Sequence, residues 1–163
     1  MRKLAALTFL TVDGVMQAPG HPDEDTSGGF TDGGWCGPFW DGVMEQVMRE
    51  AMAEPYALLL GRNTYETFAA HWPNADDPVA RKLNASTKYV VTSNPRELEW
   101  ENSVTITGNV VEEIKRLKSQ AGPLLQVHGS WQLLQSLIEH DLVDELRLWT
   151  FPRFHGFRET VIW

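Results

Sequence analysis

Tyr56-Ala57-Leu58-Leu59-Leu60-Gly61-Arg62-Asn63-Thr64 gives the clearest indication of the fold class. Its five leading residues follow Pro55 and have the length and apolar character of a strand buried on both faces. Gly61 and the polar residues after it predict a turn that leads into a short helix over about 64–70. A buried strand that runs directly into a helix is the repeating unit of a parallel α/β sheet.

The same alternation of strands and helices continues in both directions from this stretch. Apolar patterning predicts further strands over about 4–12, 88–92, 104–107, 124–127 and 144–151. Helical spacing predicts helices over about 40–53, 79–85, 110–120 and 130–138, the last with Ser130 as its N-cap. We therefore expect an α/β fold of three layers around a central, largely parallel sheet. Residues 1–152 form one domain in this interpretation, and residues 153–163 form an atypical tail.

Composition limits the class of protein. The net charge is −8, which argues against a nucleic-acid partner because phosphate binding needs a basic face. No apolar run approaches the roughly 18 residues that span a bilayer. Cys36 is the single cysteine, so an internal disulfide framework and a multi-cysteine metal site are excluded. We expect a cytoplasmic protein without a metal or a membrane partner.

Residues 17–38 form a long glycine-rich segment with six glycines. Loops longer than about 12–15 residues in compact domains are often functional, and this one is expected to be a lid over a ligand. Pro38 is placed to open the helix over 40–53, whose apolar residues from Trp40 through Val43 and Val47 to Ala51 are expected to face inward. Cys36 in this loop is more readily an incidental cysteine than a nucleophile.

Three predicted strands end in groups suited to binding an anion. The first ends in Gly61, Arg62 and Thr64, the second in Thr92 and Ser93, and the third in Gly129 and Ser130. Helix N-termini attract anions, and ligands of open parallel sheets lie outside the carboxyl ends of the strands. Each turn alone also has a purely structural explanation. Three of them in one chain favour a phosphorylated cofactor or substrate.

Two carboxylates, Asp41 and Glu45, are spaced to lie on one face of the first helix. They are either part of a solvated helix face or a carboxylate site that anchors or protonates a nitrogen heterocycle. His128, at a strand end, is more readily a structural or pocket-lining residue than a general base. The tryptophans Trp35 and Trp40 more readily pack in the core and the lid than form a stacking platform.

These segments resemble the dihydrofolate reductase superfamily. The chain is more similar to the riboflavin-biosynthesis reductase branch, the RibD C-terminal domain of the bifunctional deaminase-reductase. The matching stretches follow the order of the family and are Thr11–Met16, Leu58–Glu66, Lys88–Ser93, Gln126–Ser130 and Leu142–Leu146.

The resemblance implies an NADPH-dependent reductase of a pterin-like or aminopyrimidine-like ring, similar to 5-amino-6-(5-phosphoribosylamino)uracil reductase or dihydrofolate reductase. It assigns the adenosine side of NADPH, with its 2′-phosphate, to Gly61, Arg62, Thr64, Thr92 and Ser93. It assigns the pyrophosphate to Gly129, Ser130, Trp131 and Gln132. It places the catalytic carboxylate at Glu45, or one turn earlier at Asp41, and substrate contacts at Asp13 and Trp40.

Residues 153–163 depart from the family pattern, which continues with two more strands. We expect the sheet to end with the strand over 144–151, because Pro152 cannot donate to a ladder. An exposed sheet edge favours self-association, so we expect a homodimer in which Phe154, Phe157 and Trp163 pack against a neighbour or the edge. The alternative function is a non-catalytic nucleotide-binding or structural domain with a truncated reductase fold.

Overall fold

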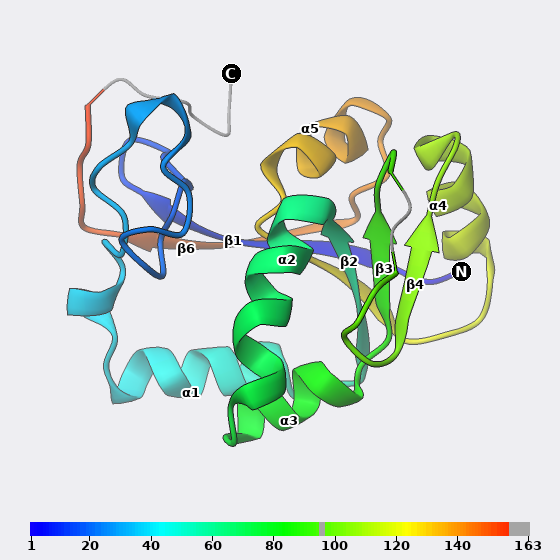
Figure 1. The fold of residues 1–163 in the computed structure, drawn as a ribbon, viewed down its shortest axis with the longest axis horizontal. Coiled ribbons are helices and arrows are strands. Elements are labelled where there is room, and N and C mark those ends of the chain that lie inside the picture. The colour runs from blue at the N-terminus through cyan, green and yellow to red at the C-terminus, as the bar shows by residue number, and fades with distance from the viewer. Residues whose placement is uncertain (95–96, 157–163) are drawn as a thin grey trace. The chain divides into compact units, whose positions relative to one another are not determined.

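A computed structural model describes residues 1–94 and 97–156. Its strands are β1 (Leu4–Thr11), β2 (Tyr56–Gly61), β3 (Lys88–Val91), β4 (Ser103–Ile106), β5 (Leu124–His128) and β6 (Glu145–Phe151). They form one six-stranded parallel sheet in the order β4-β3-β2-β5-β1-β6 (Figure 1). The predicted α/β fold with a parallel central sheet is therefore confirmed, and β6 is the last strand of the described residues.

Every predicted helix is present. The α-helices are α1 (Gly42–Ala51), α2 (Arg62–His71), α3 (Pro78–Ala85), α4 (Val110–Ser119) and α5 (Trp131–Glu139). Three single 3-10 turns, Ser27–Gly29, Gly37–Phe39 and Trp72–Asn74, lie in the connections. Within the described ranges, none of these helices has the length and apolar character needed to cross a membrane.

The chain divides into two compact units. The first consists of residues 1–6 and 54–146, and the second of residues 7–53 together with the chain from residue 147 onward. β1 and β6 each contribute residues to both units.

In the first unit, helices cover both faces of the sheet (Figure 1). Ala57 and Leu59 of β2 point to one face, where they pack with Ile114 of α4 and Leu134 of α5. Alternate residues of β2, such as Leu58, point to the other face, which α2 and α3 cover. β2 is fully buried because both of its faces are covered, as its unbroken apolar run predicts.

Lys88 at the start of β3 is the largest fully buried side chain of the described residues. Its ammonium donates hydrogen bonds to the carbonyl oxygens of Asn84 and Glu101, at 2.7 and 2.9 Å. It also lies 4.3 Å from the centre of the Trp100 ring. Burial lowers the pKa of Lys88 to about 8, although the nearby Glu101 carboxylate partly offsets this effect. The charge is tolerated inside because two carbonyl oxygens and an aromatic ring surround the ammonium.

In the second unit, the core is built from aromatic residues of the long loop and of β6. Phe30 and Trp35 of the loop are buried with Phe151. The rings of Phe9 and Phe151 are in edge-to-face contact, with their centres 5.3 Å apart. The loop is also tied to itself, since Gln17 donates to the carbonyl oxygens of Asp25 and Ser27. The glycine-rich segment is therefore an ordered part of this core, and its motion as a lid stays a prediction.

The prediction for α1 was wrong about the residue at which the helix starts and about its buried face. The helix begins at Gly42 rather than Trp40, and Pro38 belongs to the preceding 3-10 turn. None of its residues is fully buried, and Val43 and Val47, which were expected to face inward, are exposed, Val43 by 70%. The loop aromatics fill the core of this unit, so α1 contributes to it only through the half-buried Met44.

The chain directly after β6 runs beside the residues that follow β1. The carbonyl oxygen of Arg153 accepts from the amide of Val12 at 3.0 Å, and the amide of His155 donates to the carboxylate of Asp13 at 3.0 Å. Phe154 is 67% exposed, so its predicted packing partner does not come from the described part of this chain. The predicted contacts of Phe157 and Trp163 lie outside the described residues.

Candidate functional site

Three neighbouring strands of the first unit bring the predicted anion-binding turns to one end of the sheet. Gly61 of β2 pairs in register with Val91 of β3, so the residues after them, Arg62 and Thr92, leave adjacent strands at the same level. β2 also pairs with β5 in parallel, and β5 runs directly into Gly129. The parallel sheet therefore places the Gly61, Thr92 and Gly129 turns side by side.

Ser130 links two of these turns. Its hydroxyl accepts a hydrogen bond from the amide of Gly61 at 3.0 Å and donates one to the carbonyl oxygen of His128 at 3.2 Å. The sequence predicted a capping side chain here. Ser130 does occupy the N-cap position of α5, but it makes no side-chain cap hydrogen bond because its hydroxyl is engaged with Gly61. The N-termini of α2 and α5 are therefore tied together, and neither is capped by a side chain.

The turn before α5 has an unusual backbone. Gly129 and Ser130 are consecutive residues in the left-handed region, with φ of +57° and +55°. Glycine adopts this conformation freely, whereas serine does so at a cost. A Cβ atom at Gly129 would lie 3.7 Å from the methyl carbon of Thr64, so this turn lies against the first turn of α2. Amide groups at such uncapped helix starts are suited to phosphate oxygens.

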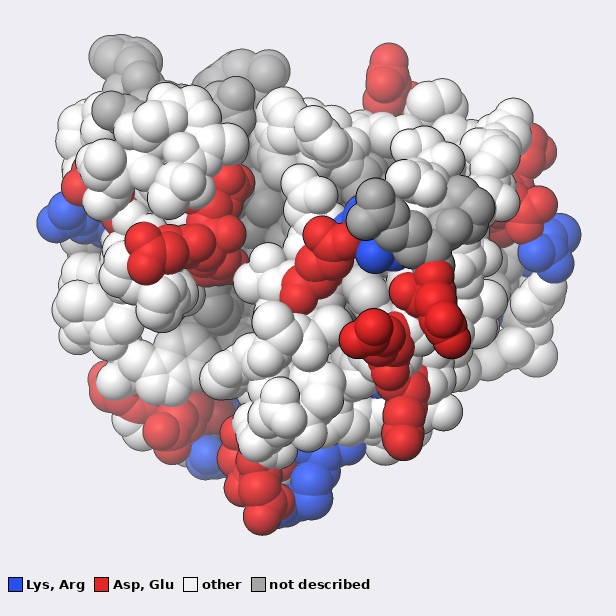
Figure 2. Space-filling model, in the orientation of Figure 1, with Lys and Arg blue, Asp and Glu red and all other residues white. Residues whose placement is uncertain are grey.

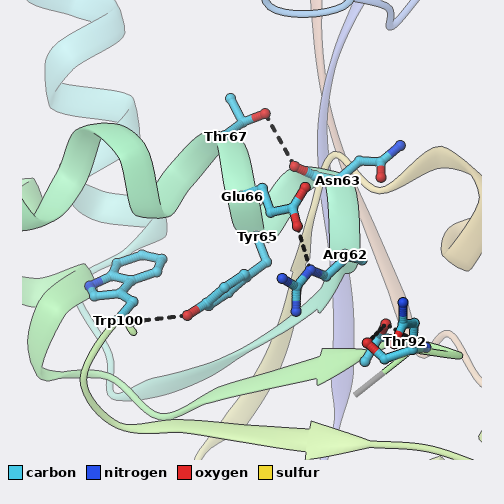
Figure 3. Close-up of polar contacts among 8 residues, drawn as sticks. Arg62, Asn63, Tyr65, Glu66, Thr67, Thr92 and Trp100 are labelled. Carbon is cyan, nitrogen blue, oxygen red and sulfur yellow. Dashed lines mark hydrogen bonds and ion pairs between the residues drawn. The ribbon is translucent and has the colours of Figure 1, made fainter. Parts of the chain in front are cut away.

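Arg62, the first residue of α2, is held on two sides (Figure 3). Its Nε donates to Oε1 of Glu66 at 2.6 Å, and its guanidinium carbon lies 5.8 Å from the centre of the Tyr65 ring. Its side chain is 23% exposed, but Nη1 is buried and has no hydrogen-bond partner among residues 1–94 and 97–156. A buried guanidinium N–H without an acceptor is unfavourable, so this position is suited to an anionic ligand.

Thr92 and Ser93, the other predicted contacts of the adenosine side, follow β3. The hydroxyl of Thr92 accepts from the amide of Asn94 at 3.1 Å and so closes a local turn. Thr92 is buried, whereas Ser93 is exposed. In the described residues neither of them hydrogen bonds to Arg62, although Figure 3 shows Thr92 just beyond the tip of β3.

Trp131 and Gln132 form the first turn of α5, and both are exposed at their side chains. His128, two residues before this helix, has its Nε2 3.0 Å from Oε1 of Gln126. Burial lowers the pKa of His128 to about 4, so its ring is neutral near neutral pH. This environment fits the structural explanation of His128 better than that of a general base.

The remaining predicted residues lie in the second unit. Asp13 accepts from the hydroxyl of Thr11 at 2.5 Å and from the amide of His155 at 3.0 Å. Burial raises the pKa of the Asp13 carboxyl, but these and other hydrogen bonds to the carboxylate outweigh it and the net pKa is below the ordinary value. Both oxygens of Asp13 are thus engaged within the chain, which fits a residue that shapes the loop.

The two carboxylates near α1 have different surroundings. Asp41 is the N-cap, and its Oδ1 accepts from the amide of Met44 at 2.9 Å, so it lies at the cap rather than on the helix face that the sequence predicted. Glu45 lies in the first turn with an exposed carboxylate, 3.7 Å from the Arg49 guanidinium. Trp40 precedes them with an indole that is 42% exposed and contacts Phe9 edge to face. Of the two, Glu45 has the carboxylate that is exposed and accessible to a ligand.

Cys36 is buried in the loop core of the same unit. Burial, together with the nearby Glu24 carboxylate, raises the pKa of its thiol to about 11. Because the thiolate is the reactive form, Cys36 is unreactive near neutral pH, in keeping with an incidental cysteine. Across the described ranges, no three His, Cys, Asp or Glu side chains come together in a way that could hold a metal ion.

Sequence reasoning missed two contacts around Arg62 and Gly61, one of them made by a residue, Glu66, that was not a predicted site residue. Glu66 was part of a matching stretch, but its contact with Arg62 was not foreseen, although the i, i+4 spacing of the two residues on a helix is a signal for it. The hydroxyl of Ser130 was expected to cap α5, and no local pattern reveals that it bonds to Gly61, 69 residues away.

Acidic side chains outnumber basic ones on the face drawn in Figure 2, in keeping with the net charge of −8. A small anionic ligand must therefore be held by local donors such as Arg62 and the helix starts rather than by a broad positive field.

Comparison with known proteins identifies the family of the chain. The model of the RibD C-terminal domain family matches residues 2–162, which includes most of the tail in which the sequence showed no family pattern. The chain is also 28% identical over 100 residues to "Uncharacterized protein YyaP" of Bacillus subtilis (strain 168). That alignment covers 58% of this chain and 53% of the relative, so the matched part is about half of the relative's length. The chain belongs to the RibD C-terminal domain family, a reductase-like family of the dihydrofolate reductase superfamily.

Proposed function

We propose that this protein is an NADPH-dependent reductase of a pterin-like or aminopyrimidine-like heterocycle. The observation that carries the proposal is the pair of uncapped helix starts tied together by Ser130 and Gly61, beside the buried, unpartnered Nη1 of Arg62. Two anion-binding positions on adjacent strands fit the two phosphate-bearing parts of a dinucleotide. Family membership supports the reductase class.

The hydrogen-bond donors of the first unit are of the types that the phosphates and the adenosine of NADPH require. Arg62 at the start of α2 would hold the 2′-phosphate, with Gly61, Thr64, Thr92 and Ser93 on the adenosine side. The turn and first residues of α5, Gly129, Ser130, Trp131 and Gln132, would hold the pyrophosphate through their amides. NADPH, when bound, supplies the hydride. The guanidinium is the group that would distinguish NADPH from NADH, because only NADPH carries the 2′-phosphate.

The residues of the second unit are assigned to the substrate. Trp40 presents an exposed indole to which a flat heterocycle would stack. Reduction of a C=N bond needs a proton on nitrogen, and Glu45 is our first choice for the acid that delivers it. Asp41 is the second choice because its carboxylate already caps α1. Asp13 would support the substrate side through the backbone of its turn.

The second candidate is a nucleotide-binding or structural domain without turnover. It is favoured by the engaged carboxylates, since Asp13 and Asp41 both accept hydrogen bonds from the chain itself. A nucleotide-binding domain would share the cofactor site with the reductase and differ in that no hydride is transferred, whereas a structural domain would not use the site.

A turnover assay separates the two functions. Purified protein is mixed with NADPH and a panel of dihydrofolate, pterins and phosphoribosylated aminouracils, and loss of the reduced nicotinamide absorbance is followed. The reductase is expected to consume NADPH with at least one compound of the panel, and faster than it consumes NADH. NADPH binding with no consumption across the panel would favour a nucleotide-binding domain without turnover, and no binding of NADPH would contradict the reductase and leave the structural domain.

A further inference from the structure

The contact between Arg62 and Glu66 suggests a role for a residue that would not itself touch the cofactor. Both residues lie on α2, one turn apart, and their 2.6 Å contact is among the shortest ion pairs of the described residues. Glu66 is 55% exposed, whereas Arg62 is mostly buried. An exposed ion pair of this spacing contributes little to stability, so its short length calls for another explanation.

The pair divides the donors of the guanidinium into two groups. Nε donates to Glu66, and the guanidinium carbon lies over the Tyr65 ring. Nη1 is buried, and no residue in the described part of the chain accepts a hydrogen bond from it. Tyr65 is itself fixed, because its hydroxyl accepts from the amide of Trp100 at 3.0 Å (Figure 3). Glu66 and Tyr65 thus hold the guanidinium, and its Nη1 donors are available to a ligand.

We propose that Glu66 is a positioning residue that holds Arg62 in the orientation needed to bind the 2′-phosphate of NADPH. This inference rests on the proposed function. A free arginine side chain has many rotamers and loses that freedom when it binds a phosphate. Glu66 removes part of this loss in advance, because the arginine is already oriented in the free protein. NADH has no group that contacts Arg62, so its binding does not depend on Glu66.

A carboxylate near a phosphate also repels it, and this effect has the opposite sign. Glu66 is more than half exposed, so its charge is screened by water and salt. Its hydrogen bond to Nε, in contrast, acts directly on the arginine. We therefore expect positioning to outweigh repulsion.

Two substitutions separate the two effects. Glu66→Ala removes both the charge and the hydrogen-bond acceptor, whereas Glu66→Gln removes the charge and keeps an acceptor oxygen. Dissociation constants for NADPH and NADH are measured calorimetrically for both variants. Glu113→Ala is the matched control, since Glu113 forms a 2.6 Å pair with Arg116 on the surface of α4. Thermal unfolding of each variant reports any general loss of structure.

The positioning role predicts that Glu66→Ala weakens NADPH binding about three- to tenfold, the range for one ordered side chain. NADH binding of this variant, and both cofactors with Glu66→Gln or Glu113→Ala, should stay within about twofold of the wild type. Unchanged or tighter NADPH binding by Glu66→Ala would overturn the inference, as would equal losses for NADPH and NADH. If the wild-type protein fails to bind NADPH, the proposed function fails with it, so the two failures are distinguishable.

Discussion

Glu45 lies in the first turn of α1 with its carboxylate exposed, and Asp41 one turn earlier accepts a backbone hydrogen bond. The resemblance to the family favoured Glu45 over Asp41 as the acid, but the i, i+4 spacing alone did not show that Asp41 is the cap, because this spacing is the same for a pair inside a helix and for a pair that includes the cap. The structure separates them by role. Asp41 stabilises the start of the helix, and Glu45 has only a long contact with Arg49.

The proton-donor role of Glu45 predicts a specific kinetic effect. Glu45→Gln should lower turnover by about 10²- to 10⁴-fold, the usual contribution of a positioned acid, and leave NADPH affinity unchanged. Asp41→Asn is the matched variant, since asparagine caps a helix as well as aspartate does. Single-turnover rates and NADPH binding are the measurements. Wild-type rates in both variants would show that the proton comes from water or from the substrate.

His128 gives a second prediction at the residue scale. Burial lowers its pKa from 6.5 to about 4, so between these values the unfolded chain binds more protons than the folded one. The contribution of a neutral His128 to stability is therefore complete above the unfolded pKa and is lost as the pH falls toward the folded pKa.

The free energy of unfolding can be measured by urea denaturation at about pH 7 and pH 5, for the wild type and for His128→Asn, whose side chain does not titrate. The free energy of unfolding should fall more for the wild type than for the variant over this interval. An equal fall in both proteins would mean that His128 is not a source of the acid sensitivity.

At the scale of elements, the sequence predicted each strand and helix because each carries its own periodicity. The unbroken apolar run of β2 and the leucines of α5 pack as their spacing indicates. α1 is the exception in its packing, since Val43 and Val47 have helical spacing but are exposed. Periodicity shows that a helix has an apolar face, but it does not show what else competes to fill the core, here Phe30 and Trp35 of the loop.

For the candidate site, the placement of the turns could be predicted from the sequence, but the contacts between them could not. Register and parallel topology follow from the pattern, so the turns after β2, β3 and β5 were expected at one end of the sheet. Contacts between side chains of different turns were not predictable. The bond of Ser130 to Gly61 depends on a left-handed serine, which serine rarely adopts and which no sequence pattern signals.

Ser130 therefore gives the prediction at this scale. Ser130→Ala removes both hydrogen bonds of the hydroxyl and keeps a side chain in the left-handed region, so it should lower the free energy of unfolding by about 1–2 kcal/mol. Ser130→Gly loses the same bonds but relieves about 1 kcal/mol of backbone strain, and should be close to the wild type. Chemical denaturation measures both. Equal stability of the alanine and glycine variants would contradict the account of this turn.

At the scale of the whole molecule, the end of the sheet favours self-association. β6 is the last strand in the sheet order, and its residues Leu146 and Leu148 are exposed. Phe154, three residues after β6, is exposed as well. Apolar side chains gathered at a sheet edge favour pairing with a second copy. Pro152 and the tail led to the same expectation from the sequence, and we propose a homodimer.

Light scattering after size-exclusion chromatography tests this proposal. The full chain is expected to run as a dimer or larger species, and deletion of residues 153–163 should change the oligomeric state or reduce solubility. Phe154→Ser tests the exposed aromatic residue without shortening the chain. A monomer that is equally stable with and without residues 153–163 would show that the tail has no part in association.

The central claim for the whole molecule is that it binds NADPH through Arg62 at the start of α2. The most direct test is equilibrium binding of NADPH and NADH to the wild type and to Arg62→Ala. A charge-assisted guanidinium–phosphate contact contributes roughly 1.5–3 kcal/mol, so the variant should bind NADPH about ten- to a hundredfold more weakly and NADH almost unchanged. Equal losses for both cofactors, or no loss for NADPH, would contradict the account.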